Sequence, residues 1–297
     1  MKTIDFYKGS NEEIVVALGF FDSIHVGHKA IINRAKDVSK TLNCNYAVFT
    51  FTNDVDSVLD CSNGLVFTYQ ERIEKLEKLS VNTVISTNFT KEFSQVDALK
   101  FFNTLITNFK VKAIVCGKDY RFGRNGVGNV NLLSELCKNI GIELHVVDDV
   151  TSNGIRVSTT DIKHLLLRGE IELANQLLGE CYSITGEVVH GREVGREMGF
   201  PTANVVIDSN KVKIKMGVYK THVILNGKVY NGITNYGSRP TFDLNDVLTE
   251  TYLDGYQGDL YGKVITVYFD KFIRKCIKFN NIEELTLQLQ SDLREIQ

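Results

Sequence analysis

The sequence predicts two successive fold classes, an open parallel α/β sheet and then a small antiparallel β-barrel closed by a C-terminal helix. Apolar strand-like runs alternate with helical patterns as far as Gly179, and short β-branched runs separated by glycine and polar turns begin at Tyr182. Near the end, apolar residues recur at helical spacing. Since 297 residues are enough for two hydrophobic cores, we predict one domain over residues 1–181 and a second over residues 182–297.

Composition narrows the class of protein. A hydrophobic content of 43% with 24% charged residues is typical of a soluble globular protein. The formal net charge of −2 argues against a nucleic-acid or anionic-membrane partner, because such partners usually need a concentrated basic face. No apolar leader follows Met1, and no later run approaches the length of a membrane span. We therefore predict small-molecule ligands; the sequence does not specify an oligomeric state.

The six cysteines lie far apart and form no Cys-x-x-Cys pair. This spacing predicts neither a zinc site nor a disulfide framework, and it fits a reducing cytoplasm.

The first half of the chain alternates strands and helices. We predict strands at 14–18, 45–51, 83–85, 112–115 and 143–147, and helices at 30–38, 71–79, 96–109 and 131–139. In such a parallel sheet, ligands bind at the carboxyl ends of the strands.

One of these strand ends leads into Gly-Phe-Phe-Asp-Ser-Ile-His-Val-Gly-His at residues 19–28. A helix that starts near Gly27 would offer unpaired backbone N–H groups and a positive dipole end to phosphate. His25 and His28 would each donate a hydrogen bond to an oxygen that gains charge, while Gly27 allows close approach. The stretch resembles the GxHxGH signature of nucleotidylyltransferases; the plain alternative is two ordinary histidines beside a strand end.

Two later stretches add candidates to the same site. The glycine-rich loop 117–126 carries Lys118, Arg121 and Arg124 and would close over an anion, with Tyr120 or Phe122 against a ring; its alternative is a solvated turn. Residues 157–163, Val-Ser-Thr-Thr-Asp-Ile-Lys, begin a helical pattern. There Ser158 or Thr159 would be the N-cap of a helix. The functional alternative is that the helix start and Lys163 bind phosphate. The amphipathic pattern that follows ends at Gly179, a C-cap.

The second half has β texture. We predict strands at 182–189, 211–215, 218–225, 228–234, 248–253 and 263–269, and a final helix whose capping box pairs Asn280 with Glu283.

Two segments in this half carry polar candidates for phosphoryl transfer. Within Gly-Phe-Pro-Thr-Ala-Asn (199–204), Pro201 fixes the backbone, and an extended chain would place Thr202 and Asn204 on one face, where their oxygens suit Mg²⁺. The alternative is a proline turn with local hydrogen bonds. Glu250 lies in a strand-like run and would deprotonate a substrate hydroxyl for attack on a γ-phosphate; an exposed strand glutamate is the alternative.

Together these motifs resemble one family over nearly the whole chain, the prokaryotic bifunctional riboflavin kinase/FMN adenylyltransferases, also called FAD synthetases. The resemblance also includes Leu-Leu-Gly-Glu-Cys-Tyr (177–182), Gly-Ser-Arg-Pro-Thr-Phe (237–242) and Asp-Leu-Tyr-Gly (259–262). It implies a Rossmann-like nucleotidylyltransferase domain that transfers AMP from ATP to FMN. It also implies a β-barrel that phosphorylates riboflavin, with Mg²⁺ as cofactor and FAD as the final product.

The resemblance also implies roles for single residues. His25 and His28 stabilise the adenylyl transition state, Glu250 is the kinase base, and Thr202 and Asn204 hold Mg·ATP. The remaining implied contacts with ATP or phosphate come from Gly19, Phe20, Asp22, Gly27, Asp119, Arg121, Ser158, Thr159, Thr160, Lys163, Gly191, Gly195, Phe200 and Pro201.

Three departures from the family pattern keep other functions open. Asn53 and Asp54 replace a proline-histidine motif, Lys163 replaces an arginine, and Cys276 stands where an acidic residue is common. The alternatives are a riboflavin kinase with a weakened or structural N-terminal domain, and a flavin-binding regulator without turnover.

Overall fold

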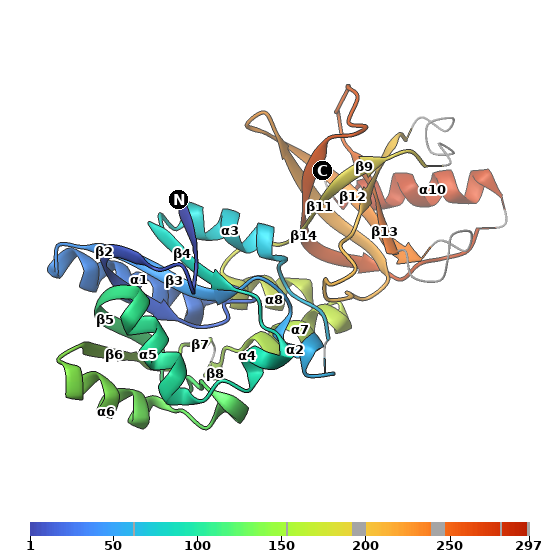
Figure 1. Ribbon diagram of the computed structural model, residues 1–297. Coiled ribbons are helices and arrows are strands. Elements are labelled where there is room, and N and C mark those ends of the chain that lie inside the picture. Colours follow the sequence, from blue (N-terminus) through green and yellow to red (C-terminus); the bar gives the residue numbers. More distant parts are fainter. Residues whose placement is uncertain (62, 153, 192–199, 239–246, 280, 296–297) are drawn as a thin grey trace. The chain divides into compact units, whose positions relative to one another are not determined.

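The computed structural model describes residues 1–61, 63–152, 154–191, 200–238, 247–279 and 281–295 (Figure 1). The chain forms two compact units, Met1–Thr159 and Thr160–Gln297. The predicted division into domains at residue 181 remains a prediction about which residues each activity needs.

The first unit contains a parallel sheet of the predicted kind. Its six strands lie in the order β1-β4-β3-β2-β5-β6, and each neighbouring pair is parallel. The strands are β1 (Lys2–Asp5), β2 (Ser10–Leu18), β3 (Asn45–Phe51), β4 (Thr83–Thr87), β5 (Phe109–Gly117) and β6 (Glu143–Val147), with a small antiparallel pair, β7 (Thr151–Ser152) and β8 (Ile155–Arg156). The helices are α1 (Val26–Thr41), α2 (Val55–Val58), α3 (Tyr69–Lys78), α4 (Lys91–Ser94), α5 (Ala98–Asn108) and α6 (Val130–Ile140), with a 3₁₀ turn η1 (Arg124–Gly126).

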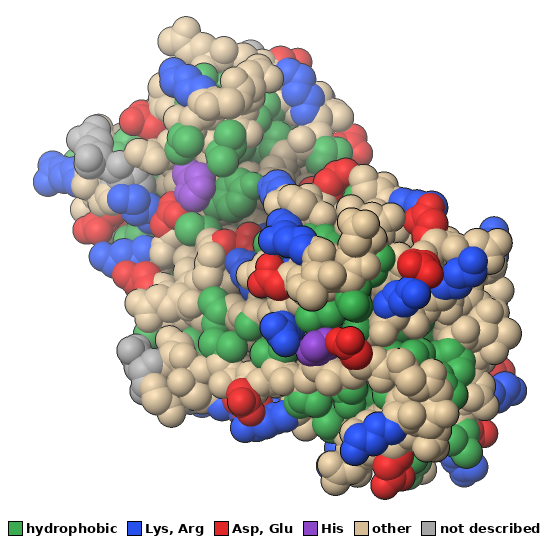
Figure 2. Space-filling model, turned by 90° about the vertical axis from the view of Figure 1, so that its left-hand side faces the viewer, with side chains coloured by type: hydrophobic (Ala, Val, Ile, Leu, Met, Phe, Trp, Pro, Cys, Tyr) green, Lys and Arg blue, Asp and Glu red, His purple; other side chains and the backbone are tan. Residues whose placement is uncertain are grey.

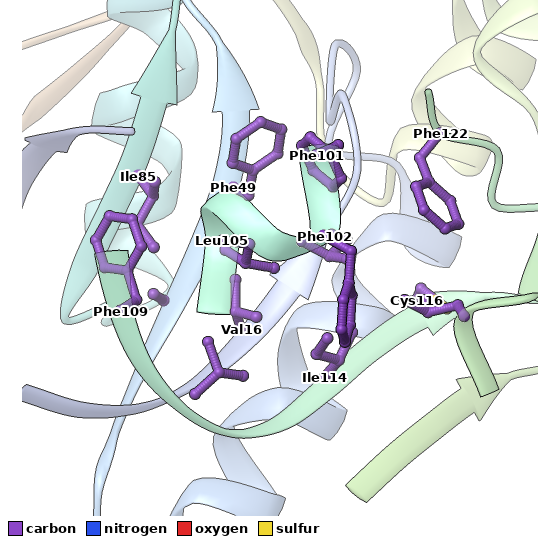
Figure 3. Close-up of a cluster of buried hydrophobic side chains, with 14 of the residues drawn as sticks. Val16, Phe49, Ile85, Phe101, Phe102, Leu105, Phe109, Ile114, Cys116 and Phe122 are labelled. Carbon is purple, nitrogen blue, oxygen red and sulfur yellow. The ribbon is translucent and has the colours of Figure 1, made fainter. Parts of the chain in front are cut away.

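Both faces of this sheet are buried. Val16 of β2 packs with Phe101 of α5 and Leu133 of α6, whereas its neighbour Val15 packs on the opposite face with Ile32 of α1. Figure 3 shows the first of these cores, rich in phenylalanine. Because successive side chains point to opposite faces, a strand covered on both sides reads as the continuous apolar run seen at 14–18.

The second unit contains the predicted barrel. Its strands close in the order β10-β13-β12-β11-β14-β9, and all of the neighbouring pairs are antiparallel. They are β9 (Tyr182–Val189), β10 (Thr202–Val206), β11 (Gly217–Leu225), β12 (Lys228–Ser238), β13 (Val247–Leu253) and β14 (Val264–Arg274), and the helices are α7 (Thr159–Arg168), α8 (Ile171–Leu178) and α10 (Ile282–Leu293). Helix α8 ends at Gly179 in the left-handed conformation, which confirms the predicted C-cap.

A line of hydroxyl groups crosses the interior of this barrel. Thr234 of β12 makes hydrogen bonds of 2.8 Å to Thr221 of β11 and to Thr251 of β13, and all three side chains are completely buried. Each hydroxyl thereby finds a partner in an environment where an unpaired one would be costly.

Three predictions about local structure were wrong. Residues 211–215 form no strand, because their amides bond elsewhere: Ile214 N donates to the Tyr236 hydroxyl (3.3 Å) and Lys215 N to the Leu166 carbonyl (3.1 Å). Strand β10 was missed. The last helix is capped by Asn281, whose side chain accepts from Glu284 N (2.8 Å), one residue later than the predicted pair; Asn280 lies outside the described residues.

Two surface properties bear on partners. None of the helices in the described residues is long and apolar enough to cross a membrane. On the face shown in Figure 2, positive and negative side chains of the described residues are interspersed.

Candidate functional site

The loop after β2 and the start of α1 bring the two predicted histidines together. The rings of His25 and His28 stack with centroids 3.7 Å apart and planes 9° apart. His25 is the N-cap of α1, and its Nδ1 accepts a hydrogen bond from the backbone N of His28 (3.1 Å). The pair therefore lies at the positive end of a 16-residue helix, at the carboxyl edge of the sheet.

This cap also fixes the protonation of His25. Because Nδ1 accepts a hydrogen bond, the proton of the neutral ring lies on Nε2, which is left as a donor. Burial lowers the pKa of His25 to about 4, and burial followed by the neighbouring charge of His25 and Arg72 lowers the pKa of His28 well below its ordinary value. Both imidazoles are therefore neutral at pH 7.

The loop that carries them has an unusual backbone. Phe21 and Ile24 are left-handed, with φ of 53° and 43°, and both side chains are completely buried. For non-glycine residues, and for β-branched isoleucine above all, this conformation costs on the order of 1–3 kcal/mol each. Strain held in a buried loop at a ligand-binding edge is typical of a functional site.

Gly19 and Gly27 are required by their neighbours. A Cβ on Gly19 would lie 2.8 Å from the Phe21 ring, and one on Gly27 would lie 3.0 Å from Cε1 of His25. The space beside Gly27 is thus filled by the His25 ring, and the glycine makes room for that side chain.

Hydrogen bonds of two loop residues connect this edge of the sheet to segments later in the chain. The Asp22 carboxylate is buried and accepts a hydrogen bond from the backbone N of Val66 (2.9 Å). The Ser23 hydroxyl lies 2.8 Å from that of Thr159. The structure therefore brings Thr159 to the loop and gives Asp22 a bonding partner within the protein; their contacts with phosphate stay predictions.

Sequence reasoning missed Arg72, which is completely buried beneath the loop. It lies on α3 and donates hydrogen bonds to the carbonyl of Phe20 (3.1 Å) and to the hydroxyl of Thr50 (2.7 Å). An arginine in an amphipathic helix usually faces water, so the sequence pattern did not mark Arg72 as buried, and only the folded structure shows it.

At the end of β5, charged side chains form a rim network. Arg156 donates to Asp119 and pairs with Asp149 (3.2 Å), which also pairs with Lys118 (3.1 Å). Asp119 and Arg156 lie near enough to His25 to influence its pKa, the carboxylate raising it and the guanidinium lowering it. Arg156 was not among the predicted site residues. The predicted residue Arg121 lies on the loop 117–126 and is exposed.

The aromatic residues of this loop pack on the core. Phe122 is buried beside Phe101 (Figure 3). The Tyr120 ring stacks on that of Phe122 with planes 13° apart. Burial raises the pKa of Tyr120. Both rings are used in packing, because the loop turns back over the sheet at Gly123, where a Cβ would collide with Ala98.

Asn53 and Asp54, which depart from the family pattern, are both held by side-chain hydrogen bonds. The Asn53 side chain both accepts from Phe89 N (2.7 Å) and donates to Phe89 O (2.9 Å), joining the segments that follow β3 and β4. Asp54 is the N-cap of α2. Side-chain hydrogen bonds thus hold the segment where the family uses prolines.

In the second unit, strand register brings the predicted kinase residues together. Asn204 of β10 lies directly opposite Glu250 of β13, which in turn lies opposite Asn235 of β12. Thr202, two residues before Asn204, shares its face. Residues opposite one another in an antiparallel pair have Cβ atoms about 4.5–5.5 Å apart, so the hydroxyl, amide and carboxylate form one oxygen-rich group.

These residues fit the implied metal. Mg²⁺ prefers oxygen ligands and is commonly held by one or two protein oxygens together with phosphate and water. Among the described residues, His, Cys, Asp and Glu side chains do not form a group of three that would hold a metal by themselves.

The flanking candidates are placed as follows. The Phe200 ring contacts the Tyr252 ring edge to face at 5.6 Å, Pro201 is exposed, and Gly191 follows β9. Gly195 lies outside the described residues. Cys276, the third departure, donates to Asn235 (3.4 Å), beside Glu250.

Helix α7 carries the remaining candidates. Ser158 precedes it, Thr160 is exposed in its first turn, and Lys163 is buried. Their contacts with phosphate stay a prediction.

Two family profiles match the chain, one described as FAD synthetase over residues 7–161 and one described as riboflavin kinase over residues 178–297. A bifunctional riboflavin kinase/FMN adenylyltransferase of Listeria monocytogenes is 33% identical, over 94% of this chain and 90% of that protein. Proteins of the same name from Bacillus subtilis and Escherichia coli are 32% and 31% identical, over 97% and 95% of this chain and 93% and 91% of their own length.

A solved structure covers the whole fold. A Streptococcus pneumoniae protein described as a macrolide-efflux protein superposes with a TM-score of 0.90 and 29% identity, over 100% of this chain and 99% of that one.

Proposed function

This chain belongs to the family of bifunctional riboflavin kinase/FMN adenylyltransferases, and we propose that it converts riboflavin to FMN and FMN to FAD, each step at the expense of ATP. The single observation that carries the proposal is that both family profiles match, one over each of two successive parts of the chain.

In the adenylyl transfer, a phosphate oxygen of FMN attacks the α-phosphorus of ATP, and pyrophosphate leaves. No group of the protein needs to form a covalent bond. The Nε2 proton of His25, the His28 ring and the N-terminus of α1 would stabilise the negative charge that develops on the phosphate oxygens. Neutral rings suit this role because they do not neutralise the attacking phosphate in the ground state.

Around this centre, the rim would bind ATP. Thr159 is held beside the loop, and Asp119 is oriented by Arg156. Gly19, Phe20, Asp22 and Gly27 would shape the nucleotide site, and Arg121, Ser158, Thr160 and Lys163 would add contacts with phosphate.

In the kinase reaction, Glu250 would accept the proton of the riboflavin hydroxyl as its oxygen attacks the γ-phosphorus of ATP. Thr202 and Asn204 would hold Mg²⁺ on the same face, with Gly191, Gly195, Phe200 and Pro201 around the nucleotide. Bound Mg²⁺ would neutralise phosphate charge and orient the transferred group. We propose a reducing, cytoplasmic setting, in which all six cysteines would stay free thiols.

One assay tests the proposal and its alternatives. The purified protein is incubated with riboflavin, ATP and Mg²⁺, and the flavins are separated by chromatography. FAD supports the two-step enzyme. FMN alone would show a kinase with a structural N-terminal domain, and unchanged but bound riboflavin would show a non-catalytic binding protein.

A further inference from the structure

A charged side chain lies buried beneath the proposed adenylyl-transfer site. Arg72 has no exposed surface, yet burial lowers the pKa of its guanidinium only to about 10, so it is a cation at neutral pH. The carboxylates of Asp22 and Asp54 and the Tyr69 hydroxyl oppose that shift. A buried ion is a weak source of stability, because apolar residues of similar volume often serve as well. A role other than stability is therefore needed to explain the buried Arg72 side chain.

The hydrogen bonds of Arg72 converge on two strand ends. The guanidinium donates to the Phe20 carbonyl (3.1 Å) after β2, and to the Thr50 hydroxyl (2.7 Å) and Phe51 carbonyl (2.8 Å) at the end of β3. The Thr50 hydroxyl donates in turn to the Phe20 carbonyl (2.6 Å). The Phe20 carbonyl therefore accepts two hydrogen bonds from this cluster, and an apolar side chain at position 72 could supply neither the charge nor the fork.

This carbonyl is the entry to the strained loop. Phe21, the next residue, has φ of 53°, and its ring meets the His28 ring at 5.1 Å in an edge-to-face contact. Strained residues of this kind persist only where the surroundings over-determine them. Arg72 and Thr50 supply that restraint at the start of the loop, as the bond from Val66 to Asp22 does further along.

The charge of Arg72 acts on the same histidine. Together with burial and with His25, it lowers the pKa of His28. The guanidinium thus favours the neutral imidazole as well as its position.

We propose that Arg72 is a positioning residue for adenylyl transfer: by holding the Phe20 carbonyl, it sets the backbone that places Phe21 and the two histidines. This inference rests on the proposed role of His25 and His28. Arg72 touches neither the substrates nor the reacting atoms in this scheme; it acts through the loop.

The test compares Arg72→Met, which keeps the volume of the side chain and deletes its charge and fork, with Arg72→Lys, which keeps the charge. Arg34→Met is the matched control, because Arg34 is exposed on α1 and, among the residues that the structure describes, bonds only His145. For each protein, kcat and KM are measured for FMN adenylylation from about pH 3.5 to pH 9, a range that includes the pKa of His25. The kinase reaction and the thermal unfolding temperature report on the intact protein.

We expect Arg72→Met to lose about 10²-fold in kcat for FAD formation, the size typical of a misplaced catalytic group, with little change in KM. The acid limb of its pH profile should move to higher pH, since removal of the cation raises the pKa of His28. Arg72→Lys should keep the acid limb in place and recover part of kcat. The kinase reaction should be unaffected in all of them.

FAD formation by Arg72→Met within threefold of the unmodified protein, or an equal loss in Arg34→Met, would overturn the inference. If Arg72→Met does not fold, Thr50→Val decides: it keeps the arginine and the volume, and deletes two hydrogen bonds, the one that Thr50 donates to the Phe20 carbonyl and the one that it accepts from Arg72. We expect it to lose about tenfold in kcat, near the worth of the hydrogen bond to the Phe20 carbonyl, and an unchanged kcat refutes the inference. If His25→Ala/His28→Ala still forms FAD normally, the site assignment itself is wrong.

Discussion

The depressed pKa of His25 predicts that acid destabilises the first unit, and His25→Asn tests this directly. Asparagine is a good N-cap, so the variant keeps the α1 cap and removes only the titrating ring. The pKa of His25 is about 4 in the folded protein, whereas an unperturbed histidine titrates near 6.5. The unfolded chain therefore binds the proton first as pH falls, and stability is lost from about pH 6.5 downward, until the folded pKa is reached.

The magnitude follows from this difference. Full linkage over roughly 2.5 pKa units is worth roughly 3 kcal/mol, of which roughly 2 kcal/mol falls between pH 7 and pH 5. The unmodified protein should lose that much more unfolding free energy over this interval than His25→Asn, because the carboxylates titrate in both proteins. Urea-dependent hydrogen exchange of β2 and β5 peptides at the two pH values measures it for the first unit alone. Parallel losses in the two proteins, within about 0.5 kcal/mol, would refute the argument.

Three further outcomes are expected. His25→Ala/His28→Ala should abolish FAD formation, at about 10²–10³-fold per lost donor, while FMN formation continues; flavin chromatography measures both, and undiminished FAD would contradict the assignment. Glu250→Gln should lower kinase turnover by about 10²–10⁴-fold with riboflavin binding retained by titration, and turnover within a few-fold would make Glu250 a plain strand carboxylate. Asp292→Ala should lower the unfolding free energy of the second unit by about 3–5 kcal/mol, measured by thermal unfolding, because the Arg274 guanidinium would lose the buried α10 carboxylate to which it donates (2.6 Å). A change below about 1 kcal/mol would show that the pair is not buried enough to matter.

Much of the fold was predictable because local pattern and burial agree. The strands at 45–51, 143–147 and 182–189 have the predicted bounds, since each is a β-rich run that ends at turn residues. The prediction at 211–215 failed although its alternation was good, because a loop amide can bond a tyrosine hydroxyl as well as a strand carbonyl. Alternation shows which face a side chain takes, but not which group satisfies the backbone.

The candidate sites differ in the same way: residues close in sequence could be predicted to lie together, whereas contacts between distant segments could not. The histidine pair could be predicted because both residues and their helix start lie within four positions of one another. The opposition of Asn204 and Glu250 depends on strand register across 46 positions, and the sequence indicated only that each lies on an extended segment. Arg72 and Phe20 are 52 positions apart, and nothing in an amphipathic helix pattern marks one arginine as buried.

The threonine line inside the barrel carries a consequence for how this protein can change over evolutionary time. Replacing Thr234 alone by valine would strand two buried hydroxyls that now bond to it, whereas replacing Thr221, Thr234 and Thr251 together would leave no polar group unpaired. The apolar alternative is thus close in energy, but replacing Thr234 before its two partners passes through an intermediate with unpaired buried hydroxyls, whereas replacing Thr221 or Thr251 first leaves the other pair bonded. Related sequences should accordingly lose Thr234 only together with Thr221 and Thr251.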